Sequence, residues 1–274
     1  MTALRSTILP AKPLVGWRVL VPRGGEWGNG LAATLRQGGA VPVVAPMINF
    51  ASTENADALA DAFARLQSGG FDWLVVTSAT TVDVLLSHAV RVPESTRIVA
   101  VGETTGSALA FAGFRVDFIP EKDNSARGLV RAWPSLSAKG RVLVPQSNVP
   151  EASLVSGFSS LGADAEFVTA YRTVGVPVAP DVVEDVTSGR IGAVLITSGS
   201  VAQQISEQLA PLPPSTVVAA IGPRTAFDAR KAGIAVDVIA ENRTADSLVE
   251  ALIDHVGARP GGAGAVPREL RQVR

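Results

Sequence analysis

The chain contains an internal repeat. The segment 71–78 (FDWLVVTS) is echoed by 191–198 (IGAVLITS), and the segment around Gly102 is echoed around Gly222, each time 120 positions further along. A match of this length without insertions indicates a duplicated domain, because the units of a solenoid are only about 20–50 residues long. Further matched pairs at the same displacement are Gly113 with Gly233 and Asp117 with Asp237.

Two more segments repeat at a displacement of 123 positions. The run 19–22 (VLVP) is matched by 142–145 (VLVP), and the pair Gly39-Ala40 is matched by Gly162-Ala163. The duplication therefore includes the first strand-sized segments of each half.

The composition narrows the classes of function. The chain has 274 residues, a length typical of about two domains. Its 24 basic and 25 acidic residues nearly balance, whereas a nucleic-acid or membrane surface would show a basic excess. With no cysteine and only His88 and His255 as histidines, a thiolate nucleophile is excluded and a histidine metal site is not expected. We also expect a cytoplasmic protein, because neither a signal peptide nor an apolar run of 18 residues is found.

Short apolar runs alternate with amphipathic stretches, which is the pattern of βα units and predicts an α/β fold with parallel sheets. Helices are expected between the strands, for example at 79–89, 104–112, 154–161 and 201–209, and Gly113 and Gly233 fit the positions just past a last helical turn. The expected strands are Arg18–Val21, Val41–Ala45, Trp73–Val76, Ile98–Val101, Arg115–Phe118, Arg141–Val144, Ala165–Val168, Ala193–Ile196, Val217–Ala220 and Ala235–Val238.

Each half thus has five strands, about the size of a flavodoxin-like sheet. Two arrangements fit the residues equally well. Each half folds as one contiguous domain, or the chain crosses over after the second strand of each half and the halves exchange pieces. The stretches Pro46–Glu54 and Thr169–Asp181 contain the Pro, Thr and Asn residues expected of such crossovers.

Polar residues recur where strands end. The carboxyl edge of a parallel sheet binds ligands, because helix N-termini present free N–H groups there. A Ser or Thr in this place is also an ordinary helix N-cap, so a structural and a binding role are both open. The segments concerned are Thr77-Ser78, Gly102–Thr105, Thr197-Ser198 and Gly222–Thr225.

Two other features stand out by composition. The loop 23–30 is rich in glycine but matches neither a dinucleotide fingerprint nor a phosphate-binding P-loop, so it is a flexible turn or an anion site made of backbone amides. Arg23 at its start either pairs with a carboxylate or is a solvated charge. Tyr171 is the single tyrosine of the chain and lies in one of the proposed crossovers. From composition alone, it could also be an ordinary half-buried aromatic residue with its hydroxyl in water.

Taken together, these residues resemble the uroporphyrinogen-III synthase family over about residues 15–256. The resemblance implies two flavodoxin-like lobes with parallel sheets, joined by a two-stranded crossover linker. One lobe would comprise residues 15–47 plus 173–256 and the other residues 48–172, with 1–14 and 257–274 as flexible tails. The resemblance rests on residues 72–78, 100–102, Thr105, Gly113, 171–173, Thr197-Ser198 and 221–226.

The resemblance also implies a reaction: cyclisation of the linear tetrapyrrole hydroxymethylbilane, with inversion of ring D, to give uroporphyrinogen III. By match to the family motif, Tyr171 would be the catalytic residue, an O–H donor that assists loss of the substrate hydroxyl. The residues expected to bind the substrate are Ser78, Thr105, Ser198, Thr225, Arg23, Gly102 and Gly222. The family tends to place a proline after the arginine, whereas Gly24 follows Arg23 here.

No metal or organic cofactor is expected. We expect a monomer that contacts hydroxymethylbilane synthase transiently and, because its charges balance, binds neither nucleic acid nor membrane. The alternative function is a non-catalytic bilobal module that binds a small ligand or acts in regulation. Such a module would not require Tyr171 in the crossover together with both Thr-Ser pairs. A nucleotide-dependent Rossmann enzyme does not fit, because the glycine fingerprint is missing.

Overall fold

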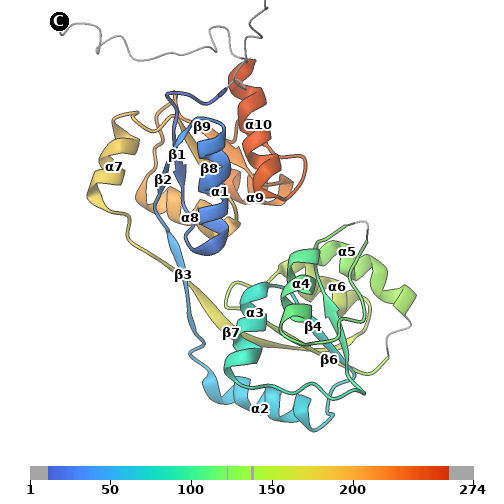
Figure 1. Cartoon of the computed structure of the whole chain (residues 1–274). Coiled ribbons are helices and arrows are strands. Elements are labelled where there is room, and N and C mark those ends of the chain that lie inside the picture. Colours follow the sequence, from blue (N-terminus) through green and yellow to red (C-terminus); the bar gives the residue numbers. More distant parts are fainter. Residues whose placement is uncertain (1–11, 122, 137–138, 259–274) are drawn as a thin grey trace, which may run out of the picture. The chain divides into compact units, whose positions relative to one another are not determined.

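A computed structural model describes residues 12–121, 123–136 and 139–258 of the chain (Figure 1). The chain divides into two compact units, unit 1 with Met1–Asn49 and Gly175–Arg274, and unit 2 with Phe50–Val174. Both divisions fall inside strands, the first in β3 (Ile48–Ser52) and the second in β7 (Asp164–Gly175). Unit 2 is therefore one continuous stretch of chain, and unit 1 is built from two stretches.

Unit 1 contains a five-stranded sheet in the order β10-β9-β8-β1-β2, and its neighbouring strands pair in parallel. Numbered along the unit, this is the 2-1-3-4-5 order of flavodoxin-like sheets. Its strands are β1 (Arg18–Val21), β2 (Val41–Val44), β8 (Ala193–Ile196), β9 (Val217–Ala220) and β10 (Val238–Ile239). Its helices are α1 (Gly25–Gln37), α7 (Pro180–Thr187), α8 (Gly199–Gln208), α9 (Pro223–Lys231) and α10 (Ala245–Gly257).

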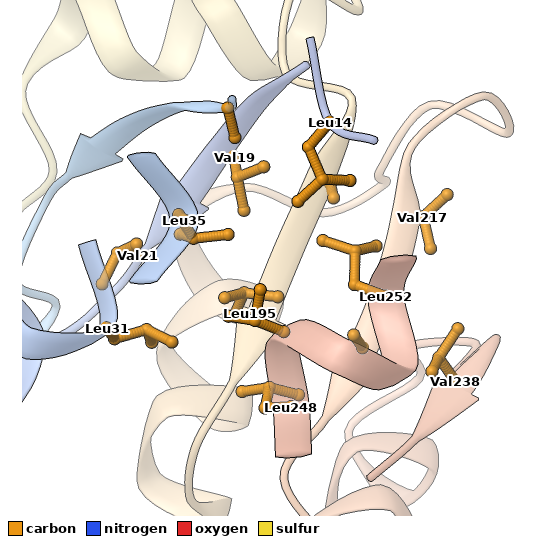
Figure 2. Packing of buried hydrophobic residues seen from close by; sticks show 14 of the residues in the cluster. Leu14, Val19, Val21, Leu31, Leu35, Leu195, Val217, Val238, Leu248 and Leu252 are labelled. Atoms are coloured by element: carbon orange, nitrogen blue, oxygen red, sulfur yellow. The ribbon is translucent and has the colours of Figure 1, made fainter. Parts of the chain in front are cut away.

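Both faces of this sheet are buried, which explains why its strands are continuous apolar runs instead of alternating ones. On one face Val19 and Val21 pack with side chains of α1 and α10, such as Leu35 and Leu252 (Figure 2). On the other face Leu20 packs with residues of α7, α8 and α9.

Unit 2 contains a second five-stranded sheet, in the order β3-β7-β6-β4-β5. The pairs β7–β6, β6–β4 and β4–β5 are parallel. By the sequence repeat, β6 and β7 correspond to β1 and β2, and β4 and β5 correspond to β8 and β9, so the two sheets have these four strands in the same order. Its remaining strands are β4 (Trp73–Val76), β5 (Arg97–Ala100) and β6 (Arg141–Ser147). Its helices are α2 (Ala56–Gln67), α3 (Ala79–Ser87), α4 (Glu103–Phe111), α5 (Ala126–Ala132), the 3₁₀ turn Trp133–Leu136 and α6 (Ala152–Ser160).

The sheet of unit 2 is also covered on both faces. Leu74 and Leu143 face a cluster formed with α2, α3 and α4, and Tyr171 belongs to this cluster. Val142 and Val144 face a cluster formed with α5, the 3₁₀ turn and α6, where Trp73, Trp133 and Phe158 are the largest members.

The prediction of two parallel α/β sheets is confirmed, and of the two arrangements open from the residues the exchanged one is found. β1 and β2 join β8, β9 and β10 in one sheet, although about half of the chain lies between them in sequence. The glycines expected at helix ends also take that role: Gly113 and Gly233 have φ angles of 85° and 82°, the left-handed conformation that glycine adopts without strain.

Four expected elements differ from the structure. The strand expected at Arg115–Phe118 is reduced to one bridge between Phe118 and Val99, and the last strand of unit 1 is only Val238–Ile239. The crossover Pro46–Glu54 contains the strand β3, and the crossover that was expected to begin at Thr169 continues β7 to Gly175. Both crossovers are extended because β3 and β7 lie side by side in the sheet. Their pairing joins segments far apart in sequence, so no local pattern predicted these strands.

The boundary of the amino-terminal tail was predicted too far along the chain. Leu14 is fully buried in the core of unit 1, and its N–H donates to the carbonyl of Gly38 at 2.9 Å. At the other end, Gly257 is the last residue of α10. Of the two predicted tails, residues 1–11 and 259–274 lie outside the described residues.

Some of the repeated polar residues are structural. A carboxylate oxygen of Asp117 accepts the N–H of Ile98 at 2.8 Å, and Asp237 accepts the N–H of Val218 at the same distance. In the same way, Thr96 in unit 2 and Thr216 in unit 1 donate their hydroxyls to backbone carbonyls. The two aspartates take the place of ladder hydrogen bonds where the last strand of each repeat is short or missing, and the two threonines join the start of β5 to that of β4 and the start of β9 to that of β8.

An ion pair in unit 2 predicts a dependence of stability on pH. The guanidinium of Arg65 on α2 donates hydrogen bonds to Glu166 on β7 and lowers the pKa of that carboxyl below its usual value of 4.5. The pair therefore stabilises the folded state above about pH 4.5, and this contribution is lost as the pH falls through the lowered pKa. We expect Glu166→Gln to lower the melting temperature by about 1–3 °C at pH 7, because the pair is partly exposed. Thermal melts should show no difference between the variant and the parent protein near pH 2, and an equal difference at both pH values would contradict the assignment.

Candidate functional site

In unit 2 the structure brings two of the expected site residues together, Ser78 and Tyr171. Ser78 follows β4 and is the N-cap of α3, since its Oγ accepts the N–H of Thr81 at 3.2 Å. The same Oγ lies 2.9 Å from the hydroxyl oxygen of Tyr171, 93 residues later, and 3.1 Å from the Thr81 hydroxyl. The N-cap serine thus has a second function beyond capping, which is to hold the phenol.

A β-bulge directs Tyr171 toward Ser78. Gln146 on β6 pairs with Thr169 on β7, but the next residue, Ser147, pairs with Tyr171, so that Ala170 is an extra residue in β7. In a regular strand Ala170 and Tyr171 would point to opposite faces. Because of the bulge, both belong to the cluster with α2, α3 and α4, and Tyr171 is only 8% exposed.

The backbone from the carbonyl of Tyr171 to the N–H of Thr173 is held by Asn148. The N–H of Asn148 donates to the carbonyl of Tyr171 at 3.0 Å, and its Oδ1 accepts the N–H of Thr173 at 2.9 Å. Arg172, which lies between them, donates to the carbonyl of Ser52 and to the carboxylate of Glu54. The orientation of the tyrosine is therefore fixed by its strand neighbours.

A hollow of about 480 Å³ lies beside Tyr171, within unit 2. The ring of Phe50 forms one side of it and meets the Tyr171 ring edge to face, with 5.5 Å between ring centres. Thr80, Asp83 and His88 on or next to α3 also line it. Another hollow, of about 590 Å³, is lined by Lys139 and Asp164 at the amino ends of β6 and β7. Parallel sheets bind their ligands at the carboxyl ends of strands, which favours the hollow beside Tyr171.

Two more expected site residues of unit 2 lie at α4, after the neighbouring strand β5. Gly102 is the N-cap of this helix and makes no side-chain cap, so the first N–H groups of α4 are not covered by a capping side chain. Thr105 is in the first turn and is only 6% exposed. The contact of its hydroxyl with the substrate stays a prediction, and Gly102 is the more exposed of the two residues.

In unit 1 the expected residues occupy the equivalent places. Ser198 caps α8 by accepting the N–H of Val201 at 3.2 Å, the distance found for Ser78. Arg23 follows β1, and its guanidinium carbon lies 5.2 Å from the centre of the Trp27 ring. β1 and β8 are adjacent in the sheet, so Arg23 and Ser198 both lie at its carboxyl edge.

Gly222 and Thr225 lie at α9 on the same edge. Gly222 is the N-cap of α9 without a side-chain cap, as Gly102 is for α4. A Cβ on Gly222 would approach the Cγ of Arg243 to 3.2 Å, so this position has less room than Gly102, where the closest atom would be 3.6 Å away. Thr225 is 5% exposed and is buried as its counterpart Thr105 is.

Two residues of the carboxyl edge of unit 2, Asn148 and Gln146, were not predicted, and Thr197 of unit 1 was noted in the repeat without an assigned substrate contact. Gln146 and Thr197 are 9% and 8% exposed, and within the described chain the Gln146 Oε1 and the Thr197 Oγ1 have no hydrogen-bond partner. A signal for Gln146 was available, because the repeat places it at the position of Arg23. Asn148 had no such signal, since its role depends on the pairing of β6 with β7.

The described residues contain no group of three or more His, Cys, Asp or Glu side chains that could hold a metal ion. Among the helices in the described ranges, none is long and apolar enough to cross a membrane.

The chain is similar to proteins of tetrapyrrole biosynthesis. A curated relative, the porphyrin biosynthesis protein HemD of Ruminiclostridium josui, is 26% identical over 89% of this chain, which spans 49% of that protein. Uroporphyrinogen-III synthase of Synechococcus elongatus is 25% identical over 88% of this chain and 96% of that protein.

Solved structures share the fold. A mutant uroporphyrinogen III synthase of Thermus thermophilus aligns with a TM-score of 0.63 at 17% identity, over 89% of this chain and 100% of that chain. The synthetase from Helicobacter pylori aligns with a TM-score of 0.60 at 17% identity, over 87% and 99%. The family model of uroporphyrinogen-III synthase HemD matches residues 29–250, which is most of the sequence. On this match, the chain belongs to the uroporphyrinogen-III synthase family.

Proposed function

We propose that this protein cyclises hydroxymethylbilane, with inversion of ring D, to give uroporphyrinogen III. The family membership supports the reaction, and the observation that carries it in this chain is the contact between Tyr171 and Ser78. The tyrosine borders a hollow at the carboxyl edge of a parallel sheet, where a substrate is expected to bind.

The reaction begins with loss of a hydroxyl from the substrate. The hydroxymethyl carbon on ring A releases its oxygen as water when a donor supplies a proton, which leaves an azafulvene cation. Ring D attacks this carbon through its substituted position to form a spiro intermediate, which fragments and recloses in the inverted orientation. A ring carbon then loses one proton, so that the net change is loss of one water. The Tyr171 hydroxyl is the group that we assign to assist the first step, as a general acid.

Ser78 prepares the phenol for this role. Its Oγ accepts the N–H of Thr81, and we assign its own proton to the oxygen of Tyr171, with the Thr81 hydroxyl as a further donor to Oγ. The phenol proton then points to the substrate, and negative charge that develops on the phenol oxygen is stabilised by the Ser78 hydroxyl and by the N-terminus of α3.

The eight carboxylates of the substrate need donors, and helix N-termini supply them. The helices α1, α4 and α9 begin after Gly24, Gly102 and Gly222, which provide no side-chain cap. The N–H groups of their first turns therefore remain available for carboxylates, except at Pro223, the first residue of α9, which has no N–H. Each helix terminus favours an anion by about 0.3–1 kcal/mol. This use of backbone donors explains how the protein can bind an octacarboxylate without a cationic side chain for each acid group.

This assignment predicts the effect of adding a side-chain cap at Gly102. Its φ and ψ angles of −157° and 166° are close to those of the capping Ser198, −162° and 164°, so serine fits without strain. We expect Gly102→Ser to raise KM about three- to tenfold, because the serine hydroxyl competes with a carboxylate for the N–H groups of α4. The value of kcat and the melting temperature should not fall. Steady-state kinetics decide the point, and an unchanged KM would exclude α4 as a carboxylate site.

The proposed reaction is tested by an isomer assay. Freshly generated hydroxymethylbilane is supplied to the protein, the products are oxidised, and the type I and type III uroporphyrins are separated by chromatography. An excess of type III establishes cyclisation with inversion. Type I alone, which is the spontaneous product, from folded protein would leave the non-catalytic binding module as the function.

The proposal extends to the setting of the reaction. We place the protein in the cytoplasm as a monomer that receives hydroxymethylbilane from hydroxymethylbilane synthase through a transient contact. Co-sedimentation of the two proteins, compared with each protein alone, measures both the oligomeric state and the contact.

A further inference from the structure

Gln146 is a buried polar residue whose side-chain carbonyl oxygen lacks a partner. It lies near the carboxyl end of β6, is 9% exposed and pairs through its backbone with Thr169 on β7. Within the described part of the chain, its Oε1 accepts no hydrogen bond. A buried acceptor without a donor destabilises a folded protein, so such a group calls for a functional explanation.

The position of Gln146 in the sheet points to a ligand. The order β7-β6-β4-β5 reverses between β6 and β4, because β6 leads to α6 on one face and β4 leads to α3 on the other. The crevice at the carboxyl ends of two such strands is the ligand site of doubly wound folds. Ser78 follows β4 at this same point, and Gln146 lies near the end of the adjacent β6.

The repeat shows how this position differs between the units. Gln146 occupies the place that Arg23 has in unit 1, 123 positions earlier. An arginine offers a positive charge to a carboxylate, whereas an amide oxygen can only accept a hydrogen bond. The same point of the two sheets therefore suits two different parts of a substrate.

We propose that the Oε1 of Gln146 accepts a hydrogen bond from a pyrrole N–H of the substrate. This inference rests on the proposed function, under which the substrate carries four pyrrole N–H groups besides its carboxylates. The carboxylates are excluded as partners of this oxygen, because they too are acceptors. Gln146 is then a binding residue that recognises the nitrogen edge of a pyrrole ring, while the helix N-termini bind the acid side chains.

The test compares two glutamines that differ in their hydrogen bonding. The side chain of Gln208 in unit 1 is satisfied: its Oε1 accepts the N–H of Val178 at 2.8 Å, and its Nε2 donates to the carbonyl of Val176 at 3.0 Å. Gln208→Leu should therefore lower the melting temperature by several degrees and leave kcat/KM unchanged. Gln146→Leu should do the opposite: the melting temperature stays the same or rises, and kcat/KM for hydroxymethylbilane falls roughly ten- to a hundredfold.

A third variant, Gln146→Glu, identifies the partner. It keeps an acceptor at the same place and adds a negative charge. With a pyrrole N–H as the partner, this variant should retain a higher kcat/KM than Gln146→Leu. If a substrate carboxylate were bound there instead, its repulsion by the glutamate would make kcat/KM lower in Gln146→Glu than in Gln146→Leu. That result would overturn the inference.

The remaining outcomes separate this inference from the proposed function. If the parent protein makes type III product and Gln146→Leu retains its kcat/KM, the glutamine is structural and only this inference fails. A loss of stability in Gln146→Leu equal to that in Gln208→Leu would lead to the same conclusion. If the parent protein gives type I product alone, the proposed function fails, and the inference fails with it.

Discussion

Tyr171→Phe is expected to lower kcat about 100- to 1,000-fold while the protein remains folded. The variant removes one oxygen, which is the proton donor assigned to the first chemical step, and general acids contribute about 10²–10⁴ to the rate. The ring stays, with its packing against Phe50 and in the cluster of unit 2. KM should change little, because the lost interaction forms mainly in the transition state. Steady-state kinetics and a thermal melt of the same preparation measure both effects, and a kcat within threefold of the parent value would remove Tyr171 from the mechanism.

A matched pair of serines separates capping from catalysis. Ser78 and Ser198 cap α3 and α8 with the same 3.2 Å hydrogen bond, but Ser78 also contacts Tyr171. Ser78→Ala and Ser198→Ala should therefore lose similar stability, about 1 kcal/mol each. Ser78→Ala should in addition lower kcat more than Ser198→Ala does, and equal values of kcat in both variants would show that Ser78 does not act through the tyrosine.

Phe158→Ala is expected to destabilise unit 2 by about 3–5 kcal/mol. The side chain is fully buried, with its ring centre 4.6 Å from that of Trp133, and it lies in the cluster between the sheet and α5 and α6. Removal of the ring leaves a cavity that neighbouring rings cannot fill without moving. Phe111→Ala is the matched control in the same unit, since Phe111 is 97% exposed and its loss should cost less than about 0.5 kcal/mol.

The same variant tests whether the two units are independent. The hydrophobic clusters of unit 1 and unit 2 share no member among the described residues. Hydrogen exchange followed by mass spectrometry should therefore show faster exchange in peptides from unit 2 of Phe158→Ala and unchanged exchange in peptides of unit 1. An equal increase in both sets of peptides would mean that the units unfold as one cooperative body.

The sequence was sufficient for the parts of the fold that depend on local pattern. The strands Arg18–Val21, Trp73–Val76, Ala193–Ile196 and Val217–Ala220 have the predicted bounds, because a strand buried on both faces is a short apolar run between turn residues. The exchange of strands between the halves was not decided by the residues themselves. Both arrangements bury the same apolar surfaces, and the resemblance to a family was needed to choose between them.

The site residues that directly follow a strand could be predicted from the sequence. The contacts that depend on how two strands pair could not. Ser78 and Ser198 each directly follow a strand, and they occupy matching positions in the internal repeat. The extra residue Ala170, which brings Tyr171 to Ser78, is a property of the register between β6 and β7 and has no local signal. The burial of Gln146, Thr105 and Thr225 likewise depends on how neighbouring elements pack, so the sequence could not rank these residues against one another.

The division of unit 1 into two stretches has a consequence for synthesis on the ribosome. All of unit 2 has been made when residue 174 is complete, so its sheet can form while the carboxyl-terminal third of the chain is still missing. β1 gains its second sheet partner only when β8 has been made, roughly 10–30 s after β2 at usual rates of translation. During that interval the apolar side chains of β1 that pack against α10 in the finished protein lack their cover. The first βαβ segment of the nascent chain is therefore the part most in need of a chaperone.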